Sequence, residues 1–408
     1  MPSISERAQR MPSSPIRRLA PYAHQAKKDG KTVHHLNIGQ PDLPTPEVVR
    51  EKLQQEIPKT VAYSDSAGEL SYRERLTDYY KSYGIDLKPE ELLITTGASE
   101  ALLFTMKTCF EAGDELIVPE PFYANYNGFA IDSGIEIAPV TTRIEEGFEL
   151  PAMEKLEERI GPKTKGFLLC NPSNPMGHLY SKEDILTLKE LVKKHDLWLI
   201  ADEVYREFCY DGAEPFSVMY LDEIADRTVL IDSVSKRYSL CGARVGALIS
   251  KNEEVLGNAL KFAQARLSPP TLGQIAADAA LDTPDSYFEE LRSEYSERRD
   301  TLVDGLTAIS GILCPRPKGA FYAMARLPVD DAERFCQWLL SDFEWKGSTV
   351  MMAPAEGFYA TEGMGRDEVR IAYVLDRKDL EEAIECLEQA LASYPGRKVE
   401  AARNAAEE

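Results

Sequence analysis

Residues 228–250 read TVLIDSVSKRYSLCGARVGALIS, and this stretch decides the fold class. The apolar run Val229–Ile231 is typical of a buried strand, and a second such run follows at Gly246–Ser250. Between them, Lys236 stands among small hydroxyl residues and Arg244 follows it. Ligands of α/β sheets bind at strand ends, so the stretch predicts a buried sheet with a candidate site at its edge.

Apolar runs of the same kind occur upstream, at Leu92–Thr95, Glu115–Val118, Gly166–Cys170 and Leu197–Ala201. Amphipathic stretches that are typical of helices lie between some of them, at 99–111, 121–132 and 182–195. Strands that alternate with helices predict βαβ units and a mainly parallel sheet with helices on both faces. We therefore expect one large α/β domain over residues 46–283.

The pattern changes after residue 283. Residues 285–309 predict one long helix, and strand-like runs at 320–326, 348–352 and 368–374 alternate with helical segments at 330–341 and 378–393. We therefore expect a smaller α+β domain over 284–408, with a polar tail from 396 onward that frays. The proline-rich residues 1–45 predict an arm that also forms part of this small domain.

Composition excludes several classes of protein. The 408 residues carry a formal net charge of −21, which disfavours binding to nucleic-acid phosphates or to anionic membranes. The seven cysteines are scattered without a CxxC pair, so we expect no disulfide framework and no zinc site, but reduced thiols in a cytoplasmic protein. The N-terminus has no apolar core of a signal peptide, and no apolar run is long enough to cross a membrane.

The five histidines show no metal-binding spacing. His34 and His35 are adjacent, so in a strand they would face opposite sides. We expect both imidazoles to be partly exposed and predict no metal site.

Lys236 and its neighbours suggest a particular chemistry. A lysine can form a Schiff base with a carbonyl, and hydroxyls with an arginine fork suit a phosphate. Ser233, Ser235 and Arg244 supply those groups, and pyridoxal phosphate (PLP) is an aldehyde that carries a phosphate. The alternative is a lysine and an arginine in an ordinary surface loop.

Three other segments end strands in the same way. Asp202 follows an apolar run, and a carboxylate there could pair with a pyridinium nitrogen while Tyr205 binds a phenolate; an ordinary helix N-cap is the alternative. Asn174 lies among turn-forming Asn-Pro steps, from which its amide could donate to the same phenolate. Thr95–Ala101 reads TTGASEA, a strand that runs into a helix whose N-terminus can bind an anion, although N-capping explains it equally well.

Taken together, the motifs resemble the fold type I PLP-dependent aminotransferases of class I/II, the aspartate aminotransferase superfamily. Nine segments follow the family's order along almost the whole chain: IGQPD at 38–42, Tyr63 with Gly68, TTGASEA at 95–101, PFY at 121–123, NPSNPMG at 171–177, ADEVY at 201–205, SVSKRY at 233–238 with Arg244, PKGAFY at 317–322 and VRIAY at 369–373. The resemblance implies an α/β large domain with a mainly parallel, seven-stranded sheet beside a smaller α+β domain.

The resemblance also implies roles for individual residues. Lys236 is similar to the lysine that binds PLP and moves the proton, and Asp202 to the partner of the ring nitrogen. Asn174 and Tyr205 match the phenolate donors. The phosphate would be held by Ala98, Ser99, Ser233, Ser235 and Arg244. Tyr123 matches the aromatic ring stacked on the coenzyme, and Tyr63 a tyrosine that reaches the neighbouring subunit's site, which implies a homodimer with shared sites. Gly39, Asn174 and Arg370 match the groups around the substrate carboxylate.

The implied reaction moves an amino group from an L-amino acid, aspartate by family default, to a 2-oxo acid such as 2-oxoglutarate. Ser99 stands where one aspartate-specific branch has a lysine, so Arg17, Arg18 and Lys27 are the candidates for binding a distal carboxylate. Aromatic, alanine or other amino acids remain alternative donors. A carbon–sulfur lyase or cyclopropane-forming synthase of the same fold is another reading. An aminotransferase-like regulator is disfavoured because the sequence shows no basic DNA-binding domain. A catalytically silent scaffold is disfavoured because the lysine, aspartate and arginine of the family's site are all present.

Overall fold

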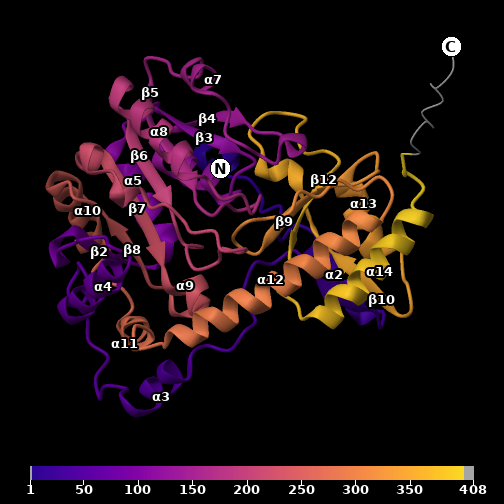
Figure 1. The fold of residues 1–408 in the computed structure, drawn as a ribbon, viewed down its shortest axis with the longest axis horizontal. Helices are drawn as coiled ribbons and strands as arrows, with labels where there is room; N and C mark the ends of the chain where they lie inside the picture. The colour runs from indigo at the N-terminus through magenta and orange to yellow at the C-terminus, as the bar shows by residue number, and fades with distance from the viewer. Residues whose placement is uncertain (1, 399–408) are drawn as a thin grey trace.

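A seven-stranded sheet forms the centre of the larger part of the molecule in the computed structural model, which describes residues 2–398 (Figure 1). The strand order is β2-β8-β7-β6-β5-β3-β4, and every strand is parallel to its neighbours except β8, which is antiparallel to both β2 and β7. Their bounds are β2 Leu92–Thr95, β3 Glu115–Glu120, β4 Glu136–Thr141, β5 Thr164–Cys170, β6 Trp198–Asp202, β7 Thr228–Ser233 and β8 Gly246–Ile249. The predicted α/β fold with a mainly parallel sheet is confirmed.

Alternate residues of each strand face two separate apolar clusters. In β6, Leu199 packs into one cluster and Ile200 into the other, as the two-residue period of a strand requires. Buried apolar side chains from helices complete both clusters, so the sheet is covered on both faces. The helices of this part are α3 Glu47–Gln55, α4 Leu70–Ser82, α5 Gly97–Cys109, α6 Asn125–Ser133, α7 Met153–Glu157, α8 Lys182–His195, α9 Val234–Arg237, α10 Glu253–Arg266 and α11 Thr271–Ala280.

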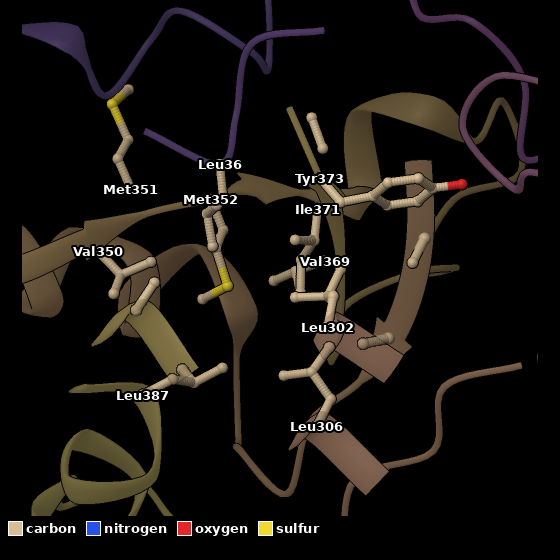
Figure 2. Close-up of a cluster of buried hydrophobic side chains, with 14 of the residues drawn as sticks. Leu36, Leu302, Leu306, Val350, Met351, Met352, Val369, Ile371, Tyr373 and Leu387 are labelled. Atoms are coloured by element: carbon tan, nitrogen blue, oxygen red, sulfur yellow. The ribbon is translucent and has the colours of Figure 1, made fainter. Parts of the chain in front are cut away.

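The long helix α12, Asp285–Ala308, leads from this sheet into the second part of the molecule (Figure 1). There, β9 Tyr322–Arg326, β11 Ala353–Pro354 and β12 Glu368–Ala372 form an antiparallel sheet in the order β11-β12-β9. Helices α13 Ala332–Ser341 and α14 Arg377–Ser393 complete it. Figure 2 shows part of the apolar core of this second part of the molecule, in which Leu302 and Leu306 of α12 lie near Val369 and Ile371 of β12.

The N-terminal segment packs against the second part of the molecule, far from it in sequence. Helices α1 Glu6–Arg10 and α2 Ala20–Lys28 precede β1 Thr32–His35, which pairs in parallel with β10 Ser348–Met351. Leu36 continues this contact, because its N–H donates to Met351 and its carbonyl accepts from Ala372. Short 3₁₀ helices occupy Pro89–Glu91, Ile144–Glu146, Val218–Tyr220, Asp222–Arg227, Cys241–Ala243 and Ala355–Phe358.

Several sequence expectations differ from the structure in detail. Strands β1, β4 and β11 are not among the predicted runs, and most of the elements that were predicted begin or end one to four residues away from their predicted bounds. The division of the chain at residues 45 and 283 stays a prediction, and the end of the expected C-terminal tail, 399–408, lies outside the described residues. Among the residues described, no helix combines the length and the apolar character needed to cross a bilayer.

Candidate active site

A cavity of about 620 Å³ lies where strands β5, β6 and β7 end. The N-terminal segment contributes Ile16, Arg17 and Gly39 to its wall, and the second part of the molecule contributes Tyr322 and Arg370. Of the residues singled out in the sequence, the following line it: Gly39, Ala98, Ser99, Tyr123, Asn174, Asp202, Tyr205, Ser233, Ser235, Lys236, Arg244 and Arg370. Side chains that are far apart in the sequence therefore share one space.

Lys236 lies on the short helix α9, directly after β7. Its Nζ donates a 2.8 Å hydrogen bond to the carbonyl oxygen of Gly39 and lies 4.0 Å from Sγ of Cys241. Burial lowers the pKa of Lys236, and the positive charges of Arg370 and Arg244 lower it further, against the opposing influence of Cys241. The amine is therefore easier to deprotonate than an ordinary lysine, as a nucleophile or general base requires.

Asp202 ends strand β6, and its carboxylate is buried. The phenol of Tyr126 donates to its Oδ2 at 2.8 Å, and the N–H of Val204 points toward its Oδ1 at 3.4 Å. Burial raises the pKa of Asp202 to about 6, although the hydrogen bond from Tyr126 opposes that rise. A buried carboxyl in this state favours a cationic partner, because a positive charge would stabilise its ionised form.

Arg370 is almost fully buried, with 1 % of its surface exposed. Its Nη1 donates to Oδ1 of Asn174 at 3.0 Å and its Nη2 to the carbonyl of Asn37 at 2.6 Å. Its Nε has no hydrogen-bond partner among the residues that the structure describes. The guanidinium also lies over the rings of Tyr322 and Phe358, at 4.5 and 4.9 Å from their centroids, and burial lowers its pKa. It is thus a rigidly held cation that has no carboxylate partner within residues 2–398.

A chain of hydrogen bonds joins Asn174 to the tyrosines of the cavity. Nδ2 of Asn174 donates to Tyr205 at 3.4 Å, and the hydroxyls of Tyr205 and Tyr322 lie 3.0 Å apart. Burial raises the pKa of Tyr205, so its hydroxyl stays protonated and can donate. Tyr123 also lines the cavity, and its ring packs edge-on against that of Tyr126 with 5.5 Å between the ring centroids.

The expected phosphate-binding groups lie together. Ala98 and Ser99 are in the first turn of α5, where backbone N–H groups are free to bind an anion. Gly97 precedes them with a φ of +73°, and a Cβ there would lie 2.5 Å from Nη2 of Arg244. Glycine is therefore needed for the guanidinium to lie against the start of the helix. On the other side, Ser233 Oγ donates to Ser235 Oγ at 2.8 Å.

Gly39 allows a second close approach. A Cβ at this position would lie 1.8 Å from the hydroxyl oxygen of Tyr322. The small residue thus lets the N-terminal segment pass directly beneath Tyr322, and its carbonyl reaches Lys236.

Tyr63 is not in this cavity. Its side chain is 80 % exposed and lines a separate surface hollow with Thr96 and Arg266. Its predicted contact with a neighbouring subunit's site stays a prediction. Among the three candidate cations for a distal carboxylate, Arg17 lines the cavity, whereas Arg18 pairs with Glu333 at 2.7 Å. Lys27 is outside the described lining.

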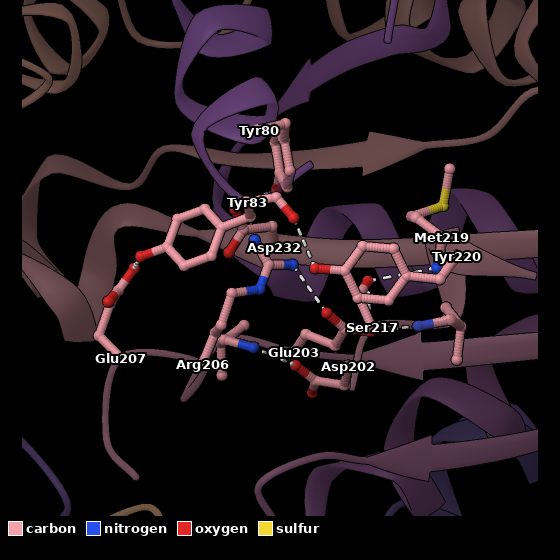
Figure 3. A network of polar contacts seen from close by, with 12 residues as sticks. Tyr80, Tyr83, Asp202, Glu203, Arg206, Glu207, Ser217, Met219, Tyr220 and Asp232 are labelled. Atoms are coloured by element: carbon pink, nitrogen blue, oxygen red, sulfur yellow. Dashed lines mark hydrogen bonds and ion pairs between the residues drawn. The ribbon is translucent and has the colours of Figure 1, made fainter. Parts of the chain in front are cut away.

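A buried polar network lies next to the ends of β6 and β7 (Figure 3). Glu203, next to Asp202, pairs with Arg206 at 2.7 Å and accepts from Ser217 and from the N–H of Val218. On the neighbouring strand, Asp232 accepts from Tyr80 and Arg237, and also from the N–H of Ser233. These contacts fix the backbone of β6 and β7 where Asp202 and Ser233 lie, so the network positions the site without lining it.

Sequence reasoning assigned no role to several residues in or next to the cavity. Tyr322 and Cys241 line it, and they contact Tyr205 and Lys236. Tyr126 is outside the described lining but donates to Asp202, which lines the cavity. Tyr322 belongs to the PKGAFY segment, from which the sequence predicts no role for the tyrosine. Tyr126 follows Tyr123 by one helical turn in a stretch that reads equally well as a core helix, so the sequence held no distinguishing signal for it.

Comparison with known proteins agrees with this geometry. A sequence model of the family described as Aminotransferase class I and II matches residues 31–387. Aromatic-amino-acid aminotransferase 2 of Thermococcus litoralis is 30 % identical over 397 residues, covering 95 % of this chain and 98 % of that protein. The aspartate/prephenate aminotransferase of Thermus thermophilus is 31 % identical over 392 residues, covering 94 % and 98 %.

Solved structures give the same result. The aspartate aminotransferase from Thermus thermophilus with maleate superposes with a TM-score of 0.87 at 29 % identity, covering 96 % of this chain and all of that one. The aspartate aminotransferase from Thermotoga maritima gives 0.86 at 31 % identity with the same coverage. The resemblance seen in the sequence motifs is thereby confirmed, and the chain belongs to the class I and II aminotransferase family and is an aminotransferase.

Proposed function

We propose that this aminotransferase uses PLP to move an amino group from an aspartate-like L-amino acid to a 2-oxo acid such as 2-oxoglutarate. The observation that carries the proposal is the shared cavity of Lys236, Asp202, Arg244 and Arg370. A half-buried amine, a buried carboxyl, an anion cradle and a clamped arginine each match one chemical group of the coenzyme or of an amino acid.

The residues fit PLP on several counts. The cradle of Ala98, Ser99, Ser233, Ser235 and Arg244 would hold the phosphate, and Gly97 leaves room for Arg244 beside it. Asp202 would face the ring nitrogen, Asn174 and Tyr205 the phenolate, and Tyr123 the face of the ring. Lys236 would bind the aldehyde carbon through Nζ. When bound, PLP supplies an electron sink that stabilises negative charge at the substrate α-carbon.

Lys236 and Arg370 would divide the work on the substrate. Arg370 binds the α-carboxylate through a fork of two N–H groups and so orients the substrate α C–H bond. Its Nε, which has no hydrogen-bond partner among the described residues, offers a further donor to the carboxylate. Burial and the nearby guanidinium groups keep Nζ of Lys236 more readily unprotonated, so it can accept the α-proton and return it. Asn174 and Tyr322 hold the arginine in place by a hydrogen bond and by ring contact.

Two observations support a dicarboxylic substrate. Arg17 lines the cavity and supplies a second cation for a distal carboxylate. The similar Thermus thermophilus enzyme was solved with maleate, which is itself a dicarboxylate. The apolar side chains of Ile16, Ile38 and Leu102 in the same wall favour aromatic donors as a second candidate, in keeping with the name of the Thermococcus litoralis relative.

The test is a panel of amino donors with the PLP-loaded enzyme. Aspartate, phenylalanine and alanine are each offered with 2-oxoglutarate, pyruvate and oxaloacetate, and the new amino and oxo acids are quantified. We expect equal amounts of both products and the highest kcat/KM with aspartate. Release of ammonia or thiol in place of a new amino acid would contradict transamination. Lys236→Ala should abolish turnover and the visible absorbance of covalently held PLP.

Arg17→Gln tests the distal carboxylate separately. We expect it to raise KM for aspartate by about tenfold while KM for alanine stays the same, because a charge-assisted hydrogen bond is worth about 1.5–3 kcal/mol. Arg18→Gln is the matched control, since Arg18 pairs with Glu333. An equal effect of the two variants would remove the role of Arg17.

We also propose a cytoplasmic homodimer. All seven cysteines are unpaired, which suits a reducing compartment. The exposed Tyr63 is a large aromatic residue suited to an interface. Sedimentation of the purified chain tests the dimer, and a monomer at micromolar concentration would contradict it.

A further inference from the structure

Three side chains with metal-binding chemistry meet on the second part of the molecule. His34 comes from β1, and Asp379 and Glu382 come from α14. One ligand atom from each lies within 4.8 Å of the others. None of the three belongs to the described lining of the active-site cavity. We infer that these residues bind a divalent transition-metal ion of the zinc class, a function beyond the proposed transamination.

His34 provides the main evidence. It was expected to be partly exposed, and this expectation is wrong, because the residue is only 5 % exposed. Its Nε2 is buried and has no hydrogen-bond partner among the residues that the structure describes. The nearest acidic atom is Oε2 of Glu382 at 4.0 Å, which is too far for a hydrogen bond. An unsatisfied buried nitrogen is costly, and a metal ion between these atoms would satisfy it.

The two carboxylates are placed to complete the site. Asp379 and Glu382 are three residues apart on one helix, so both face the same side. Bonds from zinc to nitrogen or oxygen are about 2.0–2.2 Å long, which puts neighbouring ligand atoms about 3.4 Å apart in a tetrahedral site. The exposed carboxylates can close the remaining distance by changing rotamer.

The donor set selects the ion. One imidazole nitrogen with two carboxylate oxygens suits zinc and similar transition metals, whereas calcium and magnesium prefer oxygen ligands alone. Three protein ligands leave a further position for water.

Lys378 is the competing partner. Its Nζ lies 3.7 Å from Oε1 of Glu382, but its side chain is 82 % exposed. Exposed ion pairs contribute little, so a divalent ion can displace this ammonium. Since β1 is near the start of the chain and α14 near its end, the ion would join the two and stabilise the folded state by mass action.

The experiment measures Zn²⁺ binding to the PLP-loaded, full-length enzyme by calorimetry, together with the shift in Tm. Asp379→Asn and Glu382→Gln remove ligands on the exposed helix face with little risk to the fold. Glu381→Gln is the matched control, because it removes the same charge from the same helix outside the cluster. His34→Gln is the third ligand variant, and its Tm without metal shows whether it folds.

We expect one Zn²⁺ per chain and a raised Tm in the wild type. Asp379→Asn and Glu382→Gln should each weaken binding by about tenfold or more, Glu381→Gln should leave it unchanged, and aminotransferase activity should be unaffected throughout. Co²⁺ should give d–d absorption without the thiolate charge-transfer band that a cysteine site would add. Absence of binding, equal affinity in all variants or a thiolate band would overturn the site, and none of these results would affect the proposed transamination.

Discussion

Tyr126 donates a 2.8 Å hydrogen bond to Oδ2 of Asp202, and both side chains are buried. Because this bond lowers the pKa of Asp202 against the effect of burial, it helps to keep the carboxyl ionised. Tyr126→Phe should therefore raise the pKa of Asp202 further and weaken PLP binding by about tenfold, with the loss greater at about pH 6 than at about pH 8.

Titration of the apoenzyme with PLP at the two pH values measures this effect. Tyr180→Phe is the control, since Tyr180 is another buried tyrosine but makes no hydrogen bond to Asp202, unlike Tyr126. If PLP affinity in Tyr126→Phe is unchanged at both pH values, the hydrogen bond has no role in holding the coenzyme.

Asp202 should also destabilise the apoenzyme at neutral pH. Its folded-state pKa of about 6 is above the ordinary value of about 3.9, so its contribution to stability is greatest below about pH 4 and is lost as the pH rises through about 6. Asp202→Asn removes this titration. The apo variant should be more stable than wild type at pH 7.5 by about 2–3 kcal/mol, with the difference vanishing toward pH 4.

Thermal unfolding of both apoenzymes at about pH 4.5 and 7.5 provides the measurement. With saturating PLP the order at pH 7.5 should reverse, because the variant binds the coenzyme more weakly. A stability difference that is independent of pH would show that Asp202 does not titrate in this range.

Arg370→Ala should separate substrate binding from coenzyme binding. We expect KM for amino and oxo acids to rise by about 100-fold, while PLP affinity stays close to that of wild type. The positive charge of Arg370 also lowers the pKa of Lys236, so its removal should move the acid limb of the pH–rate profile to higher pH. Arg370→Lys keeps the positive charge but loses the paired N–H donors of the guanidinium. It should raise KM without moving the acid limb of the pH–rate profile. Unchanged KM in Arg370→Ala would exclude the proposed clamp.

Gly39→Ala should displace Tyr322, because the added Cβ would lie 1.8 Å from its hydroxyl oxygen. Tyr322 contacts both Tyr205 and Arg370, so kcat/KM should fall by about 100-fold, as expected for a shift of about 1 Å in a positioned group. Gly161→Ala is the control, since no described atom lies within 4 Å of a Cβ added there. Steady-state kinetics give kcat/KM for both variants. Equal values would contradict the prediction and would mean that the backbone at Gly39 shifts without displacing Tyr322.

Local signals explain which elements the sequence predicted well. Helix α8 has its predicted bounds because Ser181 and Asp184 form a capping box at its start and Asp196 ends it in the left-handed conformation. Strand β4 was missed because it is a sheet-edge strand in which only Val140 is fully buried, so its apolar pattern is weak.

Some residues of the site could likewise be predicted from local sequence signals, and others could not. Asp202 is the last residue of a buried strand and Asn174 comes shortly after the end of another, and both placements are visible in the sequence. The contributions of Arg17 and Tyr126 depend on how distant segments pack, which no local pattern encodes. His34 is the clearest case, since its burial beside α14 follows from the pairing of β1 with β10.

The pairing of β1 with β10 also determines which part of the fold can form first during translation. The seven-stranded sheet, beside which Lys236 lies on α9, is complete in sequence once Ile249 has been synthesised. The strand partner of β1 is made only at Ser348–Met351, and Arg370 follows later still. A nascent chain can therefore build the wall that we propose binds PLP while it is still attached to the ribosome. The wall that contains Arg370 has to wait until β12 has emerged, so β1 is synthesised before the seven-stranded sheet but pairs with β10 only after that sheet is complete in sequence.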